Sequence, residues 1–216
     1  MAFILLAIIG WGQTASATGV YEIPMITSGS EPWVIDQGEV LSRATQGSLN
    51  KQLGELAKST GTETRFVTIR WLDYDVTIDD FANKLFQQWF PSEGEQNHQA
   101  VMVLDTKTNT IALVTAKDIK DQLPDDVANS IAQETALFQI RKGSYNQGLL
   151  DASNRLAAVV SGEEDPGPPV VEVEELESTF KSAEETDRKS ATIIVVVLLI
   201  LATVIPMVTY YWYVTQ

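Results

Sequence analysis

The chain contains no cysteine and a single histidine among its 216 residues. The absence of cysteine excludes a disulfide framework, a thiol nucleophile and a thiolate metal site. A Ser-His-Asp triad or an imidazole-ligated metal would have to use His98, which follows Glu95, Gln96 and Asn97 in a polar stretch. The chain also has no G-x-S-x-G elbow, no H-x-x-x-H spacing, no Walker A loop and no G-x-G-x-x-G. We therefore expect His98 to be an exposed loop residue, and we do not expect nucleotide binding.

Positive charge is scarce: 15 Lys and Arg stand against 29 Asp and Glu, a formal net charge of −14. This balance argues against nucleic acid as a partner, because affinity for it depends on neutralising phosphates with Lys and Arg. Residues 161–190 hold ten acids and three bases, which is half of the net charge. The run Glu163-Glu164-Asp165-Pro166-Gly167 has the composition of a self-repelling, extended linker. We interpret 161–190 as an acidic tether, with a docking tail as the alternative.

The N-terminus carries a short apolar run from Phe3 to Trp11, followed by small residues. Ala15-Ser16-Ala17 has the A-x-A form of an export cleavage site. The run is too short to span a bilayer, which takes about 20 residues. No Lys or Arg precedes it, so a buried N-terminal strand or a mistaken start is the alternative. We predict a signal peptide over residues 1–17.

The C-terminal run, residues 191–214, is long enough to span the hydrocarbon core of a membrane. Every position from Ile193 to Ile200 is apolar, which leaves no face for water, and Pro206 is tolerable as a kink in a transmembrane helix. The predicted anchor includes Ile193, Leu198, Leu201 and, in the aromatic headgroup zone, Trp212. Together the two ends predict an exported, single-pass protein. Arg188 and Lys189 run mildly against the positive-inside tendency in this orientation.

Between a short extension at 18–32 and the tether, residues 33–160 predict one domain with a single core. A short extended piece at Val34 precedes Ser42, which is suited to cap a helix that ends before Gly61. A strand follows at 64–72, and Thr77 opens a second helix that Pro91 closes. QAVMVLD and TIALVTA predict a hairpin, and two further helices begin near Pro124 and Tyr145. We expect an α/β fold with a mixed sheet of about four strands and helices on both faces, an α/β/α sandwich.

Carboxylates are the remaining candidates for chemistry. Asp36 sits at a strand end, and Asp118, Asp121, Asp125 and Asp126 follow the hairpin. Open α/β sheets bind ligands at strand ends, and oxygen ligands of this kind suit Ca²⁺ or Mg²⁺. We take Asp36, Asp118 and Asp121 as candidate metal ligands. The alternative is that acids after Pro124 only stabilise a helix dipole.

The aromatic end of the second helix is a candidate contact for a partner protein. The candidate contacts are Trp89, Phe90 and Pro91, which stand together there, and Asn97 in the loop that follows. Core packing is the competing interpretation of these apolar side chains.

Three motifs carry a resemblance to a known family: V-I-D-x-G-x-V-L-S from Val34, F-V-T-I from Phe66, and W-F-P-S-E-G-E-Q-N from Trp89. Over about residues 33–160 the chain resembles the TPM domain family, and most closely its branch in the thylakoid lumen of cyanobacteria and chloroplasts. That resemblance implies an α/β/α sandwich and an association with photosystem II repair and photoprotection. It also raises phosphatase activity, which has been attributed to a plant member.

The chain departs from many bacterial relatives at two positions. They carry Asp-Asn-Gly ahead of the third strand, where this chain has Asn97 and His98, and Gly-Asp-Tyr where it has Ser144. The loss of an acid at both positions argues against a carboxylate metal site.

The leading hypothesis is a thylakoid-membrane protein with its domain in the lumen that assists photosystem II assembly, repair or photoprotection by binding photosystem II subunits or assembly intermediates. The first alternative is a metal-assisted acid phosphatase of the thylakoid lumen, with Ca²⁺ or Mg²⁺ as cofactor. The second is a generic envelope scaffold.

Overall fold

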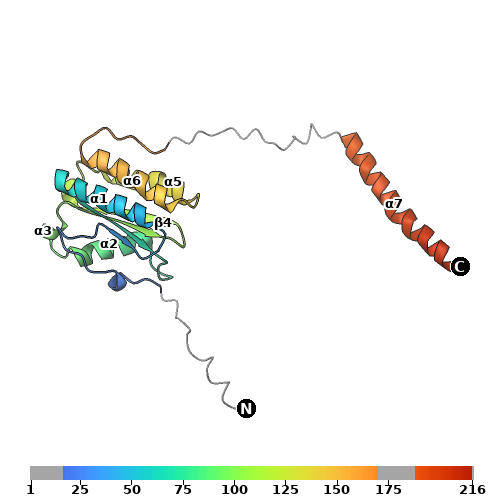
Figure 1. Cartoon of the computed structure of the whole chain (residues 1–216), viewed down its shortest axis with the longest axis horizontal. Helices are drawn as coiled ribbons and strands as arrows, with labels where there is room; N and C mark the ends of the chain where they lie inside the picture. Colours follow the sequence, from blue (N-terminus) through green and yellow to red (C-terminus); the bar gives the residue numbers. More distant parts are fainter. Residues whose placement is uncertain (1–16, 170–187, 216) are drawn as a thin grey trace, which may run out of the picture. The chain divides into compact units, whose positions relative to one another are not determined.

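The computed structural model describes residues 17–169 and 188–215 of the chain. The chain divides into two compact units, Met1–Pro169 and Val170–Gln216, which are drawn together in Figure 1 and are described separately below. The predicted signal peptide lies outside the described residues except for Ala17, and so does most of the predicted tether.

The first unit alternates strands and helices in the order that the sequence predicts. Its elements are η1 (Val20–Glu22), β1 (Val34–Asp36), α1 (Arg43–Thr60), β2 (Glu63–Ile69), α2 (Ile78–Trp89), α3 (Glu93–Gln96), β3 (Gln99–Asp105), β4 (Thr110–Thr115), η2 (Lys117–Ile119), α4 (Asp125–Ser130), the π-helical η3 (Ile131–Ala136), α5 (Leu137–Ile140) and α6 (Tyr145–Val160). The expected α/β fold with a four-stranded mixed sheet is confirmed.

The sheet has the strand order β1-β2-β3-β4. The first three strands are parallel, with Val34 opposite Phe66 and Phe66 opposite Met102. The last strand returns antiparallel to β3, so that Asp105 lies opposite Thr110 at one end of the hairpin and Ala100 lies opposite Thr115 at the other. The parallel strands β1, β2 and β3 therefore all finish at one end of the sheet, which we call its carboxyl edge. The strand β4 finishes at the opposite end, which we call the amino edge.

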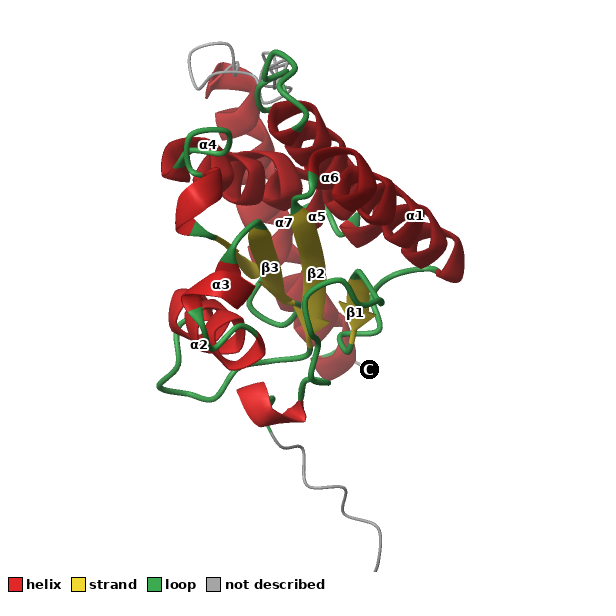
Figure 2. Ribbon diagram, turned by 90° about the vertical axis from the view of Figure 1, so that its left-hand side faces the viewer, coloured by secondary structure: helices red, strands yellow, loops and turns green. Residues whose placement is uncertain are grey.

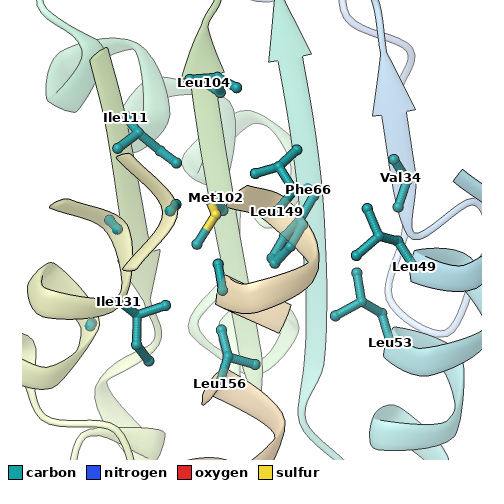
Figure 3. Close-up of a cluster of buried hydrophobic side chains, with 14 of the residues drawn as sticks. Val34, Leu49, Leu53, Phe66, Met102, Leu104, Ile111, Ile131, Leu149 and Leu156 are labelled. Atoms are coloured by element: carbon teal, nitrogen blue, oxygen red, sulfur yellow. The ribbon is translucent and has the colours of Figure 1, made fainter. Parts of the chain in front are cut away.

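Alternate side chains of the central strands enter two separate cores, because successive residues of a strand point to opposite faces. On one face Phe66 and Met102 pack with α1 and α6, and on the other Val67 and Val103 pack with α2. Figures 1 and 2 show α1 and α6 together on one face and α2 on the other. The first core is drawn in Figure 3, with Leu49 and Leu53 of α1 and Leu149 and Leu156 of α6 turned toward the sheet. Covering on both faces explains why β3 is buried throughout.

Local signals set the ends of the helices. The hydroxyl of Ser42 accepts a hydrogen bond from Thr45 N–H and caps α1, which ends at Gly61 in the left-handed conformation, with φ of 78°. The hydroxyl of Thr77 accepts from Asp80 N–H and caps α2 in the same way. The caps predicted from the sequence are confirmed.

The segment before β1 is part of the packed unit. Ile23 and Ile26 are buried against α2 and the sheet, and the Trp89 indole N–H donates to Pro24 O at 3.0 Å. At the other end, the start of the predicted tether is fastened to α6, because Arg155 donates to the Asp165 carboxylate from Nε at 2.7 Å and from Nη2 at 2.8 Å. Packed structure therefore extends beyond 33–160 on both sides.

The second unit contains helix α7 (Arg188–Val214). Within it, the 23 residues Thr192–Val214 have a mean hydropathy of 2.8, which makes the helix long and apolar enough to cross a membrane. The predicted anchor side chains Ile193, Leu198, Leu201 and Trp212 are all exposed. This candidate span supports membrane association.

Candidate functional site

A hollow in the first unit lies at the edge where the parallel strands end, the place where open α/β sheets bind ligands. Its volume is about 800 Å³. Three segments line it: the start of the described chain at Ala17, the β2–α2 loop, and the β3–β4 hairpin. We call this hollow the groove. Its lining residues are Ala17, Trp71, Leu72, Asp73, Tyr74, Val76, Thr77, Ile78, Asp105, Lys107, Thr108 and Thr110.

Two aromatic side chains and one lysine dominate the wall of the groove. The Lys107 ammonium lies 5.3 Å from the centroid of the Trp71 ring, within the range of a cation–π interaction. Tyr74 is fully exposed, although its ring is the kind of surface that proteins usually bury. The backbone of Trp71 is fixed by a hydrogen bond from Thr18 N–H at 2.9 Å.

Asp105 forms the base of the groove and is 1% exposed. One carboxylate oxygen accepts from Lys107 N–H at 2.8 Å and Thr108 N–H at 3.3 Å, and the other accepts from Leu72 N–H at 3.3 Å. These bonds join the hairpin to the β2–α2 loop. Asp105 therefore shapes the groove, and the sequence analysis missed it because a buried aspartate at a hairpin turn has no motif.

The threonine hydroxyl groups of the groove are engaged with each other or with the backbone. Thr108 and Thr110 share a hydrogen bond of 2.8 Å, and the Thr77 hydroxyl accepts from Asp80 N–H at 3.1 Å. None of these contacts pairs a nucleophile with a general base.

Asp36, the first candidate metal ligand, ends β1 on this same edge. Its two carboxylate oxygens accept from Val40 N–H at 3.2 Å, Leu41 N–H at 3.0 Å, the Gln46 side-chain amide at 3.0 Å and the Thr68 hydroxyl at 2.5 Å. Four protein donors on one carboxylate hold the loop between β1 and α1. This geometry gives Asp36 a structural role.

Glycine is required in that loop by close packing. A Cβ at Gly38 would lie 2.7 Å from Thr106 Cγ2 and 2.9 Å from the Thr68 hydroxyl oxygen. The loop that Asp36 holds therefore packs directly on β2 and the hairpin.

Asp118 and Asp121 do not join Asp36, so the expected metal set is wrong. Because β4 runs antiparallel to β3, the segment after Thr115 begins beside Ala100, at the amino ends of the parallel strands. The length of β3 separates the two edges, about 20 Å for the six steps between its seven residues at about 3.3 Å each. Within residues 17–169 and 188–215, no group of three or more His, Asp or Glu side chains is placed to hold a metal ion.

The opposite edge has a smaller hollow of about 310 Å³, lined by Glu93, Gln96, Asn97, Ala116, Lys117 and Asp118. His98 borders it with φ of 60°, and its Nδ1 lies 3.0 Å from Asp118 Oδ2. Its backbone N–H also donates to the same carboxylate, at 3.0 and 3.2 Å. Asp118 therefore holds the turn into β3, and His98 is the exposed loop residue that we expect.

Among the candidate partner contacts, the structure places two in the core. Trp89 is 2% exposed and Phe90 is fully buried, and their rings pack edge to face at 6.3 Å between centroids. The expectation that these two side chains meet a partner is therefore wrong, because both fill the core beneath α2. Pro91 and Asn97 are exposed.

A buried ion pair near the amino edge was also missed by the sequence analysis. Arg65 is fully buried, and its Nη2 lies 2.9 Å from Glu63 Oε2, while its guanidinium stacks 4.9 Å from the Trp33 ring. Burial of the Glu63 carboxyl raises its pKa, but hydrogen bonds from Gly29 N–H, Arg65 and Gln99 outweigh this, so the pKa lies below its ordinary value. The pair fastens residues 27–30 to the sheet, since Arg65 also donates to Ser30 O at 3.1 Å.

The fold and the motifs agree with one protein family. The model of the TPM domain matches residues 34–159, more than half of the chain. The chain belongs to the TPM domain family. The resemblance predicted from the motifs is thereby confirmed, and the match spans every strand of the sheet.

Three curated proteins similar to this chain are plant proteins. The chain is 31% identical over 188 residues to a chloroplastic UPF0603 protein of Arabidopsis thaliana, covering 86% of this chain and 66% of that one. It is 29% identical over 188 residues to chloroplastic UPF0603 proteins of Oryza sativa subspecies indica and japonica, covering 86% of this chain and 63% of theirs. The chain therefore spans just under two thirds of these relatives' length.

A solved structure shows the same fold. The N-terminal domain of a protein from P. gingivalis is 24% identical and superposes with a TM-score of 0.63, over 68% of this chain and 94% of that domain. The likeness supports the α/β fold of the first unit.

Proposed function

We propose that this TPM domain protein assists photosystem II assembly, repair or photoprotection by binding photosystem II subunits or assembly intermediates from the lumenal side of the thylakoid membrane. Similarity to chloroplastic proteins supports the organelle, and the sequence resemblance to the lumenal branch supports the process. The observation that carries a binding role is the groove, where the fully exposed Tyr74 and the Trp71 ring line a hollow without a paired nucleophile and base.

The proposed layout has five parts: a signal peptide at 1–17, an N-terminal extension at 18–32, a lumenal TPM domain at 33–160, an acidic linker at 161–190 and a transmembrane helix at 191–214. The exposed apolar surface of α7 supports the anchor. Export by the N-terminal segment would put the TPM domain in the lumen and Gln216 on the other side of the membrane.

The proposal is tested by recovering the tagged full chain from photosynthetic membranes in mild detergent and identifying co-purified proteins by mass spectrometry. We expect enrichment of photosystem II subunits. Recovery with unrelated complexes alone contradicts the proposal. Tyr74→Ala should reduce the enrichment, whereas Glu93→Ala, an exposed residue at the opposite edge, serves as the matched control and should retain it.

The phosphatase alternative depended on Asp36 acting with the acids at 118–126, and the sheet holds these at opposite edges. Asp36 is in addition fully engaged by four protein donors. The envelope-scaffold alternative gains no support from relatives that are chloroplastic. Binding is therefore the function that the geometry favours.

A further inference from the structure

We propose that the groove binds a Lys or Arg side chain presented by an extended basic segment of the partner protein. This inference rests on the proposed binding function and adds the chemistry of the partner to it. It follows from three features of the groove: an aromatic wall that already holds a cation, an acidic rim, and a fully exposed tyrosine beside both.

The first feature is the position of Lys107. Its ammonium stands 5.3 Å from the Trp71 ring, so the wall of the groove attracts a cation in this chain already. Lys107 itself is exposed and comes from the tip of the hairpin. We interpret it as an internal occupant, which a cation from a partner can displace without breaking the fold.

The second feature is the charge of the β2–α2 loop and of the first turn of α2. Asp73 and Asp75 in the loop and Asp79 and Asp80 in α2 are all exposed, and residues 71–80 contain no Lys or Arg. Asp73 lines the groove itself. The nearest basic residue before them, Arg70, is paired with Glu39 at 2.7 Å. The rim therefore carries an excess of negative charge, and such a rim attracts cations before contact.

The third feature is the fully exposed Tyr74, which stands in the acidic rim and lines the open volume. Trp71, Asp73 and Tyr74 all line the groove, so a cation that enters it would meet two aromatic rings and a carboxylate. Aromatic faces combined with carboxylates select Arg and Lys.

The charge of the chain excludes other occupants. Anionic lipid headgroups and nucleic acids are repelled by a protein of net charge −14 and by this rim. A second copy presents the same acidic loop and is repelled in the same way. The volume of about 800 Å³ is sufficient for one long side chain and the backbone beside it.

The test measures fluorescence anisotropy of a labelled peptide of alternating arginine and alanine, with the full-length protein held in detergent micelles. A matched peptide has glutamine in place of arginine. We expect the arginine peptide to bind at least about tenfold more tightly than the glutamine peptide. Equal affinities overturn the proposal.

Variants locate the binding. Tyr74→Ala and Asp73→Asn should each weaken arginine-peptide binding by about fivefold to tenfold, and Glu93→Gln at the opposite edge should leave it unchanged. The double variant Glu163→Gln with Glu164→Gln controls for attraction to the acidic linker. The proposal is overturned when the linker variant lowers affinity as much as the groove variants do, or when the groove variants have no effect.

Lys107→Gln provides the sharpest readout, because removing the internal occupant should tighten arginine-peptide binding by several fold. Lys117→Gln makes the same change in charge at the opposite edge and should not. Equal tightening by both variants shows a charge effect alone and overturns the displacement of Lys107. The peptide assay contains no photosystem, so peptide binding without recovery of photosystem II subunits refutes the proposed function and leaves the groove chemistry standing.

Discussion

Arg155 of α6 holds Asp165 by two parallel hydrogen bonds, of 2.7 Å from Nε to Oδ1 and 2.8 Å from Nη2 to Oδ2. The guanidinium also donates through Nη1 to the hydroxyls of Ser130 and Thr135, both at 2.9 Å. Arg155 is 4% exposed, so these groups supply the hydrogen bonds that its guanidinium cannot make with water. The pair fixes the point at which the chain leaves the TPM fold, beyond the end of α6.

Asp165→Ala should lower the free energy of unfolding of the first unit by about 1–3 kcal/mol, because it leaves a buried guanidinium without its carboxylate. Urea unfolding of the full chain in detergent, followed by tryptophan fluorescence, measures this. Glu164→Ala removes a neighbouring exposed acid and should change little. If the two variants unfold at the same urea concentration, the ion pair between Arg155 and Asp165 does not stabilise the fold.

Stability should depend on pH through Glu63. Its pKa in the folded chain lies below the ordinary value of 4.5, so near that pH the unfolded state binds more protons. The contribution of Glu63 is present in full above about pH 4.5 and is lost as the pH falls through the folded pKa. The Asp165 carboxyl, whose pKa is lowered by the hydrogen bonds from Arg155, adds to the same trend.

Glu63→Gln should flatten the fall in stability below about pH 4.5, whatever its effect at neutral pH. Urea midpoints measured across the acid range give the two slopes. Parallel curves for the variant and the original chain would show that Glu63 is not the group responsible.

Trp89→Ala should destabilise the fold by about 3–5 kcal/mol, since it removes a buried indole and its hydrogen bond to Pro24 O. Tyr74→Ala, at a fully exposed ring, should stay within about 0.5 kcal/mol. The comparison separates core aromatics from surface aromatics by unfolding alone. A loss of unfolding free energy for Trp89→Ala as small as that for Tyr74→Ala would contradict the burial of Trp89 in the core.

Asp36→Ala should cost about 1–3 kcal/mol of unfolding free energy, because four donors lose their acceptor. Asp121→Ala is the matched control among the acids first considered as metal ligands, and it should be close to neutral. Adding Ca²⁺ or Mg²⁺ should leave the unfolding midpoint of the original chain unchanged. Stabilisation by either ion that disappears in Asp36→Ala would contradict the structural role.

Much of the fold follows from short-range signals. Ser42, Thr77 and Gly61 stand where the chemistry of caps requires them, and the apolar periodicity between them determines the helix faces. The hairpin was likewise readable, since two apolar runs flank a short polar turn. The π-helical turn Ile131–Ala136 was not, because its residues are ordinary helix formers.

The candidate site was less predictable because it depends on contacts between distant segments. Lys107 meets Trp71 only after β3 is placed beside β2, and Asp165 meets Arg155 only after the chain turns back on α6. The separation of Asp118 from Asp36 could have been predicted from the sequence. The antiparallel hairpin itself takes the residues after Thr115 to the edge opposite Asp36.

The central claim is that the groove beside Tyr74 contacts photosystem II. The most direct measurement replaces Tyr74 with a photo-reactive phenylalanine analogue in the full chain, illuminates intact thylakoid membranes and identifies the cross-linked proteins. We predict that the analogue at position 74 cross-links to basic segments of photosystem II subunits. The same analogue in place of Glu93 should not form these cross-links. Identical cross-links from both positions, or cross-links from position 74 only to proteins outside photosystem II, would contradict this claim.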